Sequence, residues 1–514
     1  MAGTRAAAGA GALAAGAALG AGELLAGFGE SVPSLVRAVG AGAVDLAPPG
    51  LKDFAVAAFG TADKPALLIG ITVVSLLLGA GLGLLARGAR GLAAGGFMAF
   101  GALGLVAGAT APTGTLPGAL AAALAATAAG VVALLLLMRR WDAAYGSRHA
   151  GPAPGGADAA RRDFFRVAGA TGALALTGGA AGRWLSRAGE QVEAQRAAVA
   201  LPAPASPAPP PGQGLSVRGL TPLYVPNARF YRIDTALTVP RVDIDGWRLR
   251  VGGPPGGKAR EYRYDELLAM DLAEADVTLA CVSNEVGDDL VGNARWLGVP
   301  LAALLTGALE ERPPMPGTQV VGRSVDGFTA AFPLEALTPE RTALVALGMN
   351  GEPLPARHGF PARLVVAGLY GYVSATKWLS SIELHGPEFD GYWVPRGWAK
   401  EAPVKTQSRI DVPRHGAEVA AGRVAVAGVA WAPHRGVEAV EVRVGDGEWR
   451  AARLSESIGA DAWRQWVLAW DAEPGLHRLQ VRATDGLGRT QTERRTPARP
   501  DGATGHHTVD VRVI

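Results

Sequence analysis

The segment CVSNEVGDDLVGNARWLGVPL, from Cys281 to Leu301, contains the only cysteine of the 514-residue chain. The preceding residues, Val277 to Ala280, are mostly apolar, as is typical of a buried strand. Polar residues and Gly287 follow the cysteine, which indicates a loop. We therefore expect Cys281 to lie where a buried strand becomes a loop, a frequent position for functional side chains.

A single cysteine excludes several kinds of site within this chain. It rules out an intramolecular disulfide, a CxxCH haem attachment and a multi-cysteine zinc or iron–sulfur site. A lone thiol is more often an inert buried group than a ligand, so both interpretations of Cys281 stay open at this point. The net charge of +3 is too small, and no basic stripe is interleaved with aromatics, so we expect no nucleic-acid partner.

Two further segments bear on the role of Cys281. They are NARFYRID at residues 227–234 and RHGFPARLVVAGLYGYVSATKWL at residues 357–379. Together with the cysteine segment, and in this order, they resemble the sulfite oxidase family of molybdopterin-dependent oxidoreductases, in a membrane-anchored bacterial form. The resemblance covers residues 216–404. It implies an α+β catalytic domain in which a soft thiolate, Cys281, is the protein ligand of molybdenum.

The same resemblance implies a set of contacts to the molybdopterin cofactor. A pterin with a phosphate needs cationic groups and short polar side chains, with lysine as a point charge and arginine as a fork. Without the flanking match, His358 would read as a histidine in an ordinary turn, and Arg363 could pair with a local carboxylate. The implied contacts are Cys281 itself, Asn227, Phe230, Tyr231, Ser324, His358, Arg363, Ser374, Thr376 and Lys377.

The substrate pocket is expected to hold positive donors for an oxyanion. By its approximate position, Arg232 is the first candidate, and Tyr392 resembles the family's pocket tyrosine, with Arg396 close by. Where some family members carry basic residues after the cysteine, this chain has Asn284, Glu285 and Val286. A carboxylate at that place would disfavour a sulfite dianion.

The first 150 residues indicate a membrane domain, because uncharged runs there approach the roughly 20 residues that cross a bilayer. The run near the N-terminus is the weakest, since Glu23 lies inside it. No paired histidines are present for an intramembrane haem, and we expect neither haem nor an iron–sulfur cluster in this chain. The four predicted spans are residues 6–29, 65–86, 91–111 and 117–138.

Arginines beside these runs predict the orientation. Pairs follow the second and fourth spans, which places those ends in the cytoplasm and residues 30–64 in an outer loop. The next segment, RRDFFRVAGATGALALTGGAAG at residues 161–182, resembles a twin-arginine export signal that is retained as an anchor. The alternative is the cytoplasmic flank of an ordinary span. The export interpretation puts the catalytic domain on the extracytoplasmic side of the cell membrane.

The sequence predicts five parts. After residue 405, alternating strands separated by Gly/Asp turns resemble the immunoglobulin-like dimerisation domain of the family, which suggests a homodimer. The parts are a membrane domain with about four transmembrane helices (1–150), a twin-arginine-like signal anchor helix (151–200), a Pro/Ala linker acting as a spacer (201–215), a molybdopterin-binding domain (216–404) and the immunoglobulin-like domain (405–514).

The leading functional hypothesis is oxygen-atom transfer on a small sulfur or related oxo-compound, with electrons passing to an external carrier. The alternative within the same class is a reductase of sulfoxides or N-oxides. An alternative of another class is a metal-free binding or scaffold protein that retains the fold. The retention of Cys281 argues against the scaffold.

Overall fold

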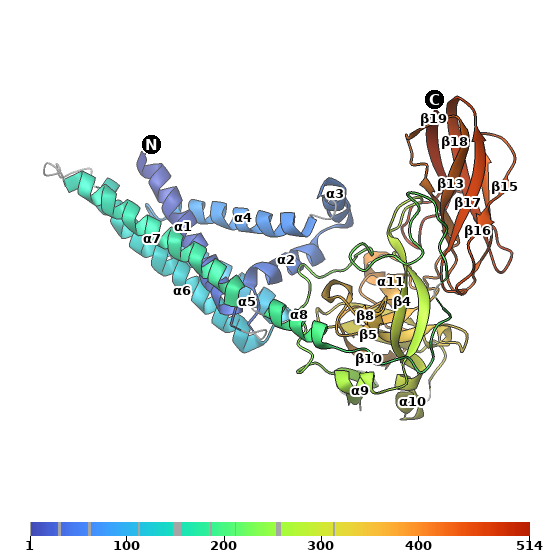
Figure 1. Cartoon of the computed structure of the whole chain (residues 1–514). Coiled ribbons are helices and arrows are strands. Elements are labelled where there is room, and N and C mark those ends of the chain that lie inside the picture. The colour runs from blue at the N-terminus through green and yellow to red at the C-terminus, as the bar shows by residue number, and fades with distance from the viewer. Residues whose placement is uncertain are drawn as a thin grey trace. The chain divides into compact units, whose positions relative to one another are not determined.

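The computed structural model divides into two compact units, Met1–Glu190 and Gln191–Ile514 (Figure 1). The first unit is helical and the second is built mainly from strands, which confirms the expected succession of apolar helices and a strand-rich domain. The structure describes residues 2–28, 32–59, 63–111, 114–146, 156–185, 188–210, 212–252, 259–311 and 314–514.

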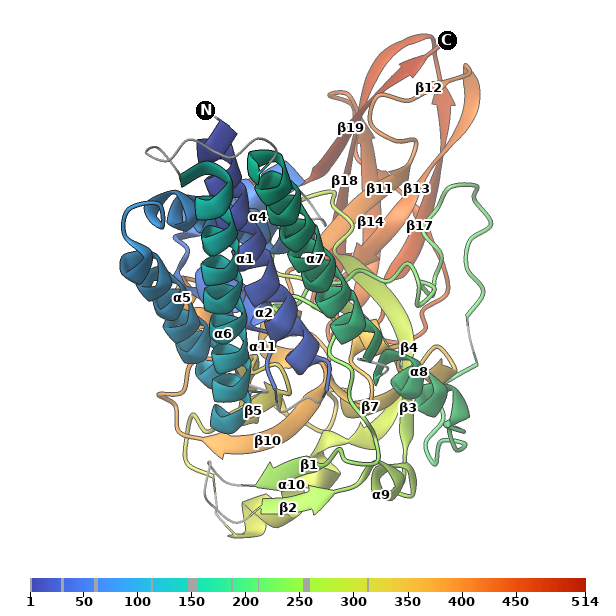
Figure 2. The ribbon, with the colours of Figure 1, turned by 90° about the vertical axis from the view of Figure 1, so that its left-hand side faces the viewer.

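Long apolar helices make up the first unit (Figure 2). Four of the described helices, α1, α4, α5 and α6 with the π-helical turn that follows it, are long and apolar enough to cross a membrane. They correspond to the four predicted spans. The helices are α1 (Ala2–Ala26), α2 (Leu35–Leu46), α3 (Pro49–Phe59), α4 (Asp63–Leu85), α5 (Arg90–Thr110), α6 (Leu116–Trp141), η2 (Asp142–Gly146) and α7 (Gly156–Leu185).

Helix α1 packs closely against α4, α6 and α7, and small residues make this possible. A Cβ atom at Gly11 would lie 2.5 Å from the backbone nitrogen of Gly83, and one at Gly20 would lie 2.6 Å from the carbonyl oxygen of Ala175. Only glycine allows two backbones to approach so closely, as in many helix pairs of membrane proteins. The Gly/Ala-rich N-terminal sequence therefore forms a tightly packed helix of the bundle.

The segment at residues 30–64, expected as an outer loop between two spans, contains the helices α2 and α3. Ser34 caps α2 by accepting a hydrogen bond from the backbone N–H of Arg37 at 3.3 Å. These helices have 12 and 11 residues, so neither reaches the length that spans a bilayer.

Two five-stranded sheets form the first part of the second unit, in the orders β2-β1-β10-β5-β6 and β3-β4-β7-β8, with β9 paired to β7. Strands β1 and β10 are parallel, and the other pairs are antiparallel. The strands are β1 (Leu249–Gly252), β2 (Ala259–Tyr262), β3 (Ala273–Ala280), β4 (Val291–Pro300), β5 (Gln319–Ser324), β6 (Thr329–Pro333), β7 (Ala343–Met349), β8 (Glu352–Pro353), β9 (Arg363–Val366) and β10 (Leu379–His385).

Short helices connect or flank these strands. Helix α8 spans the division between the two units, and the side chain of its Gln195 donates to Asp243 at 2.6 Å. The helices are α8 (Ala188–Ala198), α9 (Tyr264–Leu268), α10 (Leu301–Glu311), η3 (Leu334–Ala336), η4 (Ala356–His358), α11 (Gly371–Ser374) and η5 (Val394–Arg396).

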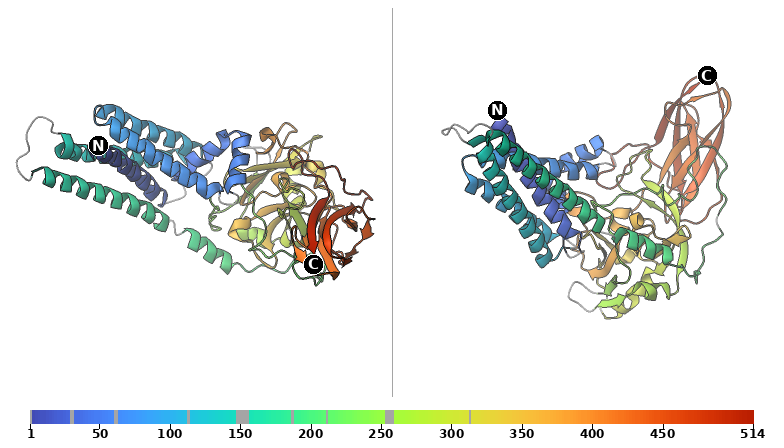
Figure 3. Two further views of the ribbon diagram at one scale, coloured as in Figure 1. Left: turned by 90° about the horizontal axis from the view of Figure 1, so that it is seen from above. Right: turned by 60° about the vertical axis from the view of Figure 1, so that its left-hand side comes forward.

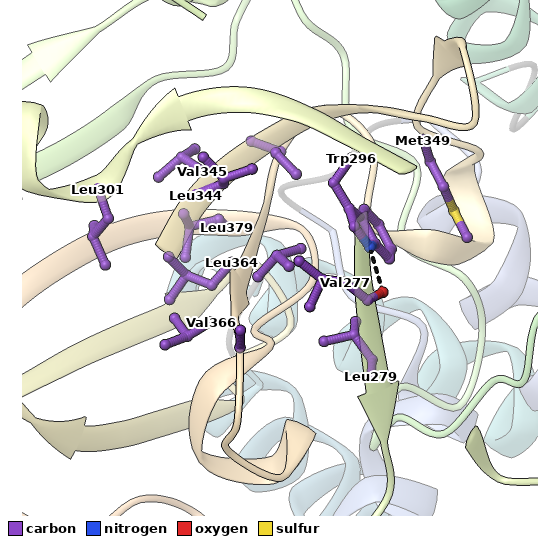
Figure 4. Close-up of a cluster of buried hydrophobic side chains, with 14 of the residues drawn as sticks. Val277, Leu279, Trp296, Leu301, Leu344, Val345, Met349, Leu364, Val366 and Leu379 are labelled. Atoms are coloured by element: carbon purple, nitrogen blue, oxygen red, sulfur yellow. Dashed lines mark hydrogen bonds between the residues drawn. The ribbon is translucent and has the colours of Figure 1, made fainter. Parts of the chain in front are cut away.

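A continuous apolar core holds these sheets together (Figure 4). Val277 and Leu279 on β3 are buried, as are Leu364 on β9 and Leu379 on β10. Trp296 on β4 is fully buried, and its indole N–H donates to the carbonyl of Val277 at 3.1 Å, so its one polar atom is satisfied. This core fixes the ends of β3 and β9, from which the loops of the candidate site extend.

The C-terminal strands form two sheets, in the orders β11-β13-β17-β16 and β12-β19-β18-β14-β15, coloured orange to red in Figure 3. Apolar side chains from both sheets share a second core. The strands are β11 (Gln407–Val412), β12 (Glu418–Val419), β13 (Gly422–Trp431), β14 (Val437–Val444), β15 (Arg450–Ala451), β16 (Arg453–Leu454), β17 (Arg464–Ala472), β18 (Gly475–Asp485) and β19 (His507–Val513).

The Pro/Ala segment at 201–215 differs from the expected spacer, because it packs on the second unit. Ser206 forms a parallel bridge with Ala273, and the carbonyl of Pro209 accepts from the Arg295 guanidinium at 2.7 Å. Proline-rich chain is already extended, so it loses little conformational entropy when it lies along a surface. Composition alone could not distinguish a free spacer from a docked strap.

Candidate functional site

Cys281 lies directly after β3, as the sequence predicts, and is 9% exposed. Its backbone N–H donates to Leu290 at 2.9 Å, and Asn284 holds the other side of the loop through a bond to the Leu290 N–H at 2.7 Å. The sulfur lies 2.8 Å from the hydroxyl of Ser283. Burial raises the pKa of the Cys281 thiol, whereas the Ser283 hydrogen bonds and the positive charge of Lys377 act to lower it.

Two tyrosines lie within electrostatic range of this sulfur. Burial raises the pKa of Tyr231 far above its ordinary value, and a negative charge on Cys281 adds to the effect. Burial also raises the pKa of Tyr370 to about 12, again with a contribution from Cys281. Both phenols therefore stay protonated at neutral pH, and each keeps a hydroxyl proton that it can donate.

Arg363 begins β9 and is 5% exposed. Its guanidinium donates to the backbone carbonyls of His358 at 3.2 Å and Ala375 at 3.4 Å, and it lies 5.0 Å from the ring centre of Trp296. Arg363 forms no ion pair with any carboxylate in the part of the chain that the structure describes. Burial lowers its pKa to about 10, so the group remains positive at neutral pH, buried and without a carboxylate.

A second buried cation, Lys377, lies in a network with one carboxylate. Its ammonium is 2.7 Å from Asp234, which also pairs with Arg232 at 2.7 Å. Burial lowers the pKa of Lys377 to about 8, although Asp234 acts in the opposite direction. Arg232, Arg363 and Lys377 bring three positive charges to this region, so Asp234 alone does not neutralise it.

His358 lies within electrostatic range of Arg363 and Lys377 and is 1% exposed. Its Nε2 atom lies 2.7 Å from the carbonyl oxygen of Asn227, and its ring meets Phe230 edge to face at 5.7 Å. Burial lowers the pKa of His358 to about 3, so the imidazole is neutral at physiological pH. The side-chain amide of Asn227 forms no hydrogen bond with His358. Its NH2 group donates to the Met349 carbonyl and to Glu352, and its oxygen accepts from Asn350.

The predicted hydroxyl contacts lie around these cations and bond to backbone. Ser374 donates to the carbonyl of Tyr370 at 3.0 Å, and Thr376 donates to that of Gly322 at 3.3 Å. Ser324 ends β5, and its hydroxyl accepts weakly from the N–H of Asp326 at 3.4 Å. All three predicted hydroxyl side chains are buried.

Tyr392 and Arg396 form a second group. The Arg396 guanidinium lies 3.7 Å from the ring centre of Tyr392, and the same ring meets Phe328 at 5.8 Å. The carbonyl of Arg396 accepts from Arg499 of the C-terminal part. The structure thus brings these two residues together, while Arg232 belongs to the network of Asp234.

Glu285 is engaged by the C-terminal part. Its carboxylate accepts from the backbone N–H of Ala498 at 3.0 Å. The charge expected to repel an anionic substrate is therefore committed to a backbone donor. The sequence offered no sign of this contact, because Ala498 lies 213 positions away.

Comparison with known proteins places this site in a family. Residues 236–393 match the oxidoreductase molybdopterin binding domain. The chain is 30% identical over 307 residues to human mitochondrial sulfite oxidase, covering 51% of this chain and 56% of that protein. It is 30% identical over 266 residues to Arabidopsis thaliana sulfite oxidase (41% of this chain, 67% of that one) and 39% identical over 158 residues to the uncharacterized oxidoreductase YuiH of Bacillus subtilis (30% and 74%).

The chain belongs to the sulfite oxidase family of molybdopterin-dependent oxidoreductases. It spans about half the length of the human relative (56%). The crystal structure of the sulfane dehydrogenase SoxCD from Paracoccus pantotrophus also matches, at 22% identity and a TM-score of 0.49, over 58% of this chain and 82% of that one.

The residues present fit a molybdopterin cofactor. A buried guanidinium that pairs with no carboxylate of the described residues, and a buried ammonium whose carboxylate partner is shared with Arg232, suit an anionic phosphate. Among the described residues, no group of three or more His, Cys, Asp or Glu is arranged to hold a metal ion. A metal held here would depend on a single thiolate together with the sulfurs of the cofactor.

The sequence interpretation missed Ser283, Asp234 and Tyr370. Ser283 lies two positions after the cysteine and Asp234 two positions after Arg232, so local spacing was the available signal for both. Tyr370 lies 89 positions from Cys281 in the chain, and only the fold brings the two together.

Proposed function

We propose that this chain is a membrane-anchored molybdopterin oxidoreductase that transfers an oxygen atom to or from a small sulfur or related oxo-compound. One observation carries the proposal. The only thiol of the chain lies at a strand end, where the buried cation Lys377 acts on it, within the segment that matches a molybdopterin-binding domain. The buried cation Arg363 belongs to the same region, because Tyr231 interacts with both Cys281 and Arg363.

Cys281 is proposed as the metal ligand. The thiol must lose its proton to bind, and the Ser283 hydrogen bond and the positive charge of Lys377 favour the thiolate. When bound, the cofactor supplies two-electron redox chemistry and oxygen-atom transfer. Tyr231 and Tyr370 remain protonated, so neither adds a negative charge near the thiolate.

The cofactor's anionic end is proposed to lie against Arg363 and Lys377. Arg363 would donate as a fork in place of its long bonds to backbone carbonyls, and Lys377 would act as a point charge. His358 is neutral and held by the Asn227 carbonyl, so it can orient a ring without adding charge. The other proposed contacts are Asn227, Phe230, Tyr231, Ser324, Ser374 and Thr376.

For the substrate, we propose an oxyanion bound by Arg232, with Tyr392 and Arg396 forming a second group of donors. A small oxyanion needs desolvated positive donors. The bond between Glu285 and Ala498 holds one oxygen of that carboxylate on a backbone donor of the C-terminal part. Sulfite is the substrate in the names of the human and Arabidopsis relatives, and it heads the substrates to be tested.

The remaining parts of the proposal concern placement in the cell. The four apolar helices support a membrane anchor, and the arginine pair at the start of α7 supports twin-arginine export to the extracytoplasmic side. The two-sheet C-terminal part supports an immunoglobulin-like domain and a homodimer formed through it. We assign residues 1–150, 151–200, 216–404 and 405–514 to the membrane, anchor, catalytic and C-terminal parts.

A substrate screen with an artificial electron dye tests the proposed activity. Purified full-length chain, produced with cofactor synthesis intact, is assayed with sulfite and related sulfur compounds under oxidising conditions, and with sulfoxides and N-oxides under reducing conditions. We expect turnover with an oxyanion of sulfur that Cys281→Ser abolishes. Protein that contains molybdenum yet acts on none of these compounds would contradict the proposal.

A further inference from the structure

The helical unit contains a cavity of about 500 Å³ lined by α1, α2, α4, α5 and α6. Its walls are almost entirely aliphatic or aromatic, as in most sites for small organic ligands, and its volume lies within the range of such sites. Phe97 and Phe100 on α5 contribute aromatic rings, and Leu35 on α2 and Leu78 on α4 contribute aliphatic wall.

One ionisable side chain, Glu23, is found among the residues that line this cavity. It lies in the last turn of α1 and accepts a hydrogen bond from the Ser34 hydroxyl at 2.5 Å. Ser75 on α4 and Thr127 on α6 add hydroxyls to the lining. A carboxylate among apolar helices is costly to retain, and such residues usually mark a functional site.

We propose that this cavity binds a lipid-soluble quinone. An aliphatic or aromatic wall suits the quinone ring and the start of its tail, and the Glu23 carboxylate, held by Ser34, can accept a hydrogen bond from a ring hydroxyl of the quinol form. A phospholipid fits the charge less well, because its phosphate would be repelled by the carboxylate. A bare acyl chain has no polar group that could form a hydrogen bond with Glu23 or Ser34.

The chemistry of a quinone matches the need of the catalytic domain, so the inference rests on the proposed function. Oxidation of a substrate by oxygen-atom transfer from water releases two electrons and two protons. Reduction of a quinone to the quinol takes up two electrons and two protons, so one quinone balances one turnover. The cavity would therefore make the quinone pool the external electron carrier.

Two glycines of α4 provide a matched pair of variants. Gly70 lines the cavity and Gly81 does not, and a Cβ atom at either position meets no atom within 4 Å. Gly70→Leu would extend into the binding space, while Gly81→Leu makes the same change outside it. Glu23→Gln keeps a hydrogen-bonding partner for Ser34, and Glu23→Leu removes it.

The experiment uses the full chain in detergent and an azidoquinone photolabel, with decyl-substituted benzoquinone as competitor. We expect saturable labelling of peptides from the cavity wall, reduced at least tenfold in Gly70→Leu and Glu23→Leu and within threefold of the parent in Gly81→Leu and Glu23→Gln. Equal labelling of all variants, no saturable labelling, or equal competition by a phospholipid would overturn the proposal.

A second readout separates this proposal from the proposed catalytic function. Dye-linked turnover of the catalytic domain should be unchanged in Gly70→Leu, while quinone-linked turnover falls at least tenfold. If the unsubstituted protein shows saturable quinone labelling but no dye-linked turnover, the proposed catalytic function is refuted and the quinone site is not. Dye-linked turnover without labelling would refute the quinone site alone.

Discussion

Arg363 is the residue whose surroundings point most directly to an anionic ligand. A buried guanidinium that bonds only to carbonyls is costly, because the charge is desolvated without an opposite charge to compensate. The fold retains this cost in a segment that matches a molybdopterin-binding domain. An anionic ligand that pairs with Arg363 would remove the cost and would gain affinity from it.

The first prediction concerns Arg363→Met. A hydrogen bond to a charged group contributes about 1.5–3 kcal/mol, so cofactor content or affinity should fall by about ten- to a hundredfold. The stability of the cofactor-free protein should stay the same or rise, because an unpaired buried charge is lost. Molybdenum content per chain and the midpoint of thermal unfolding measure the two effects.

Arg341→Met is a suitable control for that variant. Arg341 is also partly buried and donates to a carbonyl, that of Ala367 at 2.5 Å, but it lies outside the proposed cofactor contacts. It should keep its molybdenum content. The contradicting result is that Arg363→Met lowers the unfolding free energy of the cofactor-free protein by about 1.5–3 kcal/mol, the size expected for the loss of cofactor affinity. That result would mean that Arg363 stabilises the fold and does not bind a ligand.

The second prediction is a pH dependence that arises from Lys377. Its pKa of about 8 means that the ammonium is charged below this pH and neutral above it. Binding of an anionic group favours the charged form, so above about pH 8 the lysine must take up a proton on binding. Affinity should therefore fall with rising pH, by up to about tenfold per unit.

Lys377→Arg provides the comparison, because arginine stays charged across this range. Reconstitution of cofactor-free protein with released cofactor at pH 6–10 measures both curves. The parent should lose affinity above about pH 8, while the arginine variant should show a flatter curve. Parallel curves would exclude Lys377 as the titrating group.

At the scale of elements, the loop of residues 281–290 is braced by the C-terminal sheets. The Asp288 carbonyl accepts from the guanidinium of Arg409 at 2.8 Å, and Glu285 is bonded to Ala498. Gly287 has φ +97°, and a Cβ atom there would overlap the ring of His507. The C-terminal part therefore contributes to the position of Cys281, whatever its role in dimerisation.

The third prediction is that Gly287→Ala displaces this loop. The substitution adds a steric overlap with His507 to the cost of a left-handed backbone, so we expect a loss of about 2–4 kcal/mol of stability. The Cys281 thiol should react faster with a maleimide in cofactor-free protein. Gly488→Ala is the control, since Gly488 has φ +73° and open space around its Cα.

In that control, only the backbone cost of about 1 kcal/mol is expected, with unchanged thiol reactivity. Equal effects in the two variants would show that backbone strain, and not contact with His507, decides the outcome.

Elements set by local pattern were predictable from the sequence, and contacts between distant elements were not. The strand end at Cys281 followed from apolar residues that precede a polar loop, and the spans followed from run length. The docking of Ser206 on Ala273 and the bond between Glu285 and Ala498 depend on the fold, so no local pattern reveals them. The helices α2 and α3 within residues 30–64 were not predicted, because helices of 12 and 11 residues lack a span-length signal.

At the scale of the whole molecule, the proposed export of the catalytic domain rests on the arginine pair that precedes the apolar part of α7. The fourth prediction is that Arg161→Lys combined with Arg162→Lys reduces exposure of the catalytic domain to external protease in intact cells by at least tenfold. The reason is that twin-arginine recognition requires arginine specifically, whereas the positive charge is unchanged.

Arg139→Lys combined with Arg140→Lys is the matched control near the end of α6. It makes the same chemical change and keeps the positive charge that sets topology, so exposure should remain normal. Unchanged exposure in the Arg161 and Arg162 variant would favour the flank of an ordinary span over an export signal.

The central claim, that the Cys281 sulfur is bonded to molybdenum, is tested most directly by X-ray absorption at the molybdenum edge. Purified full-length protein and its Cys281→Ser variant are compared at equal metal content, because serine replaces the soft thiolate with a hard oxygen donor. The account predicts one fewer sulfur neighbour of molybdenum in the variant. An identical number of sulfur neighbours in the two proteins would contradict it.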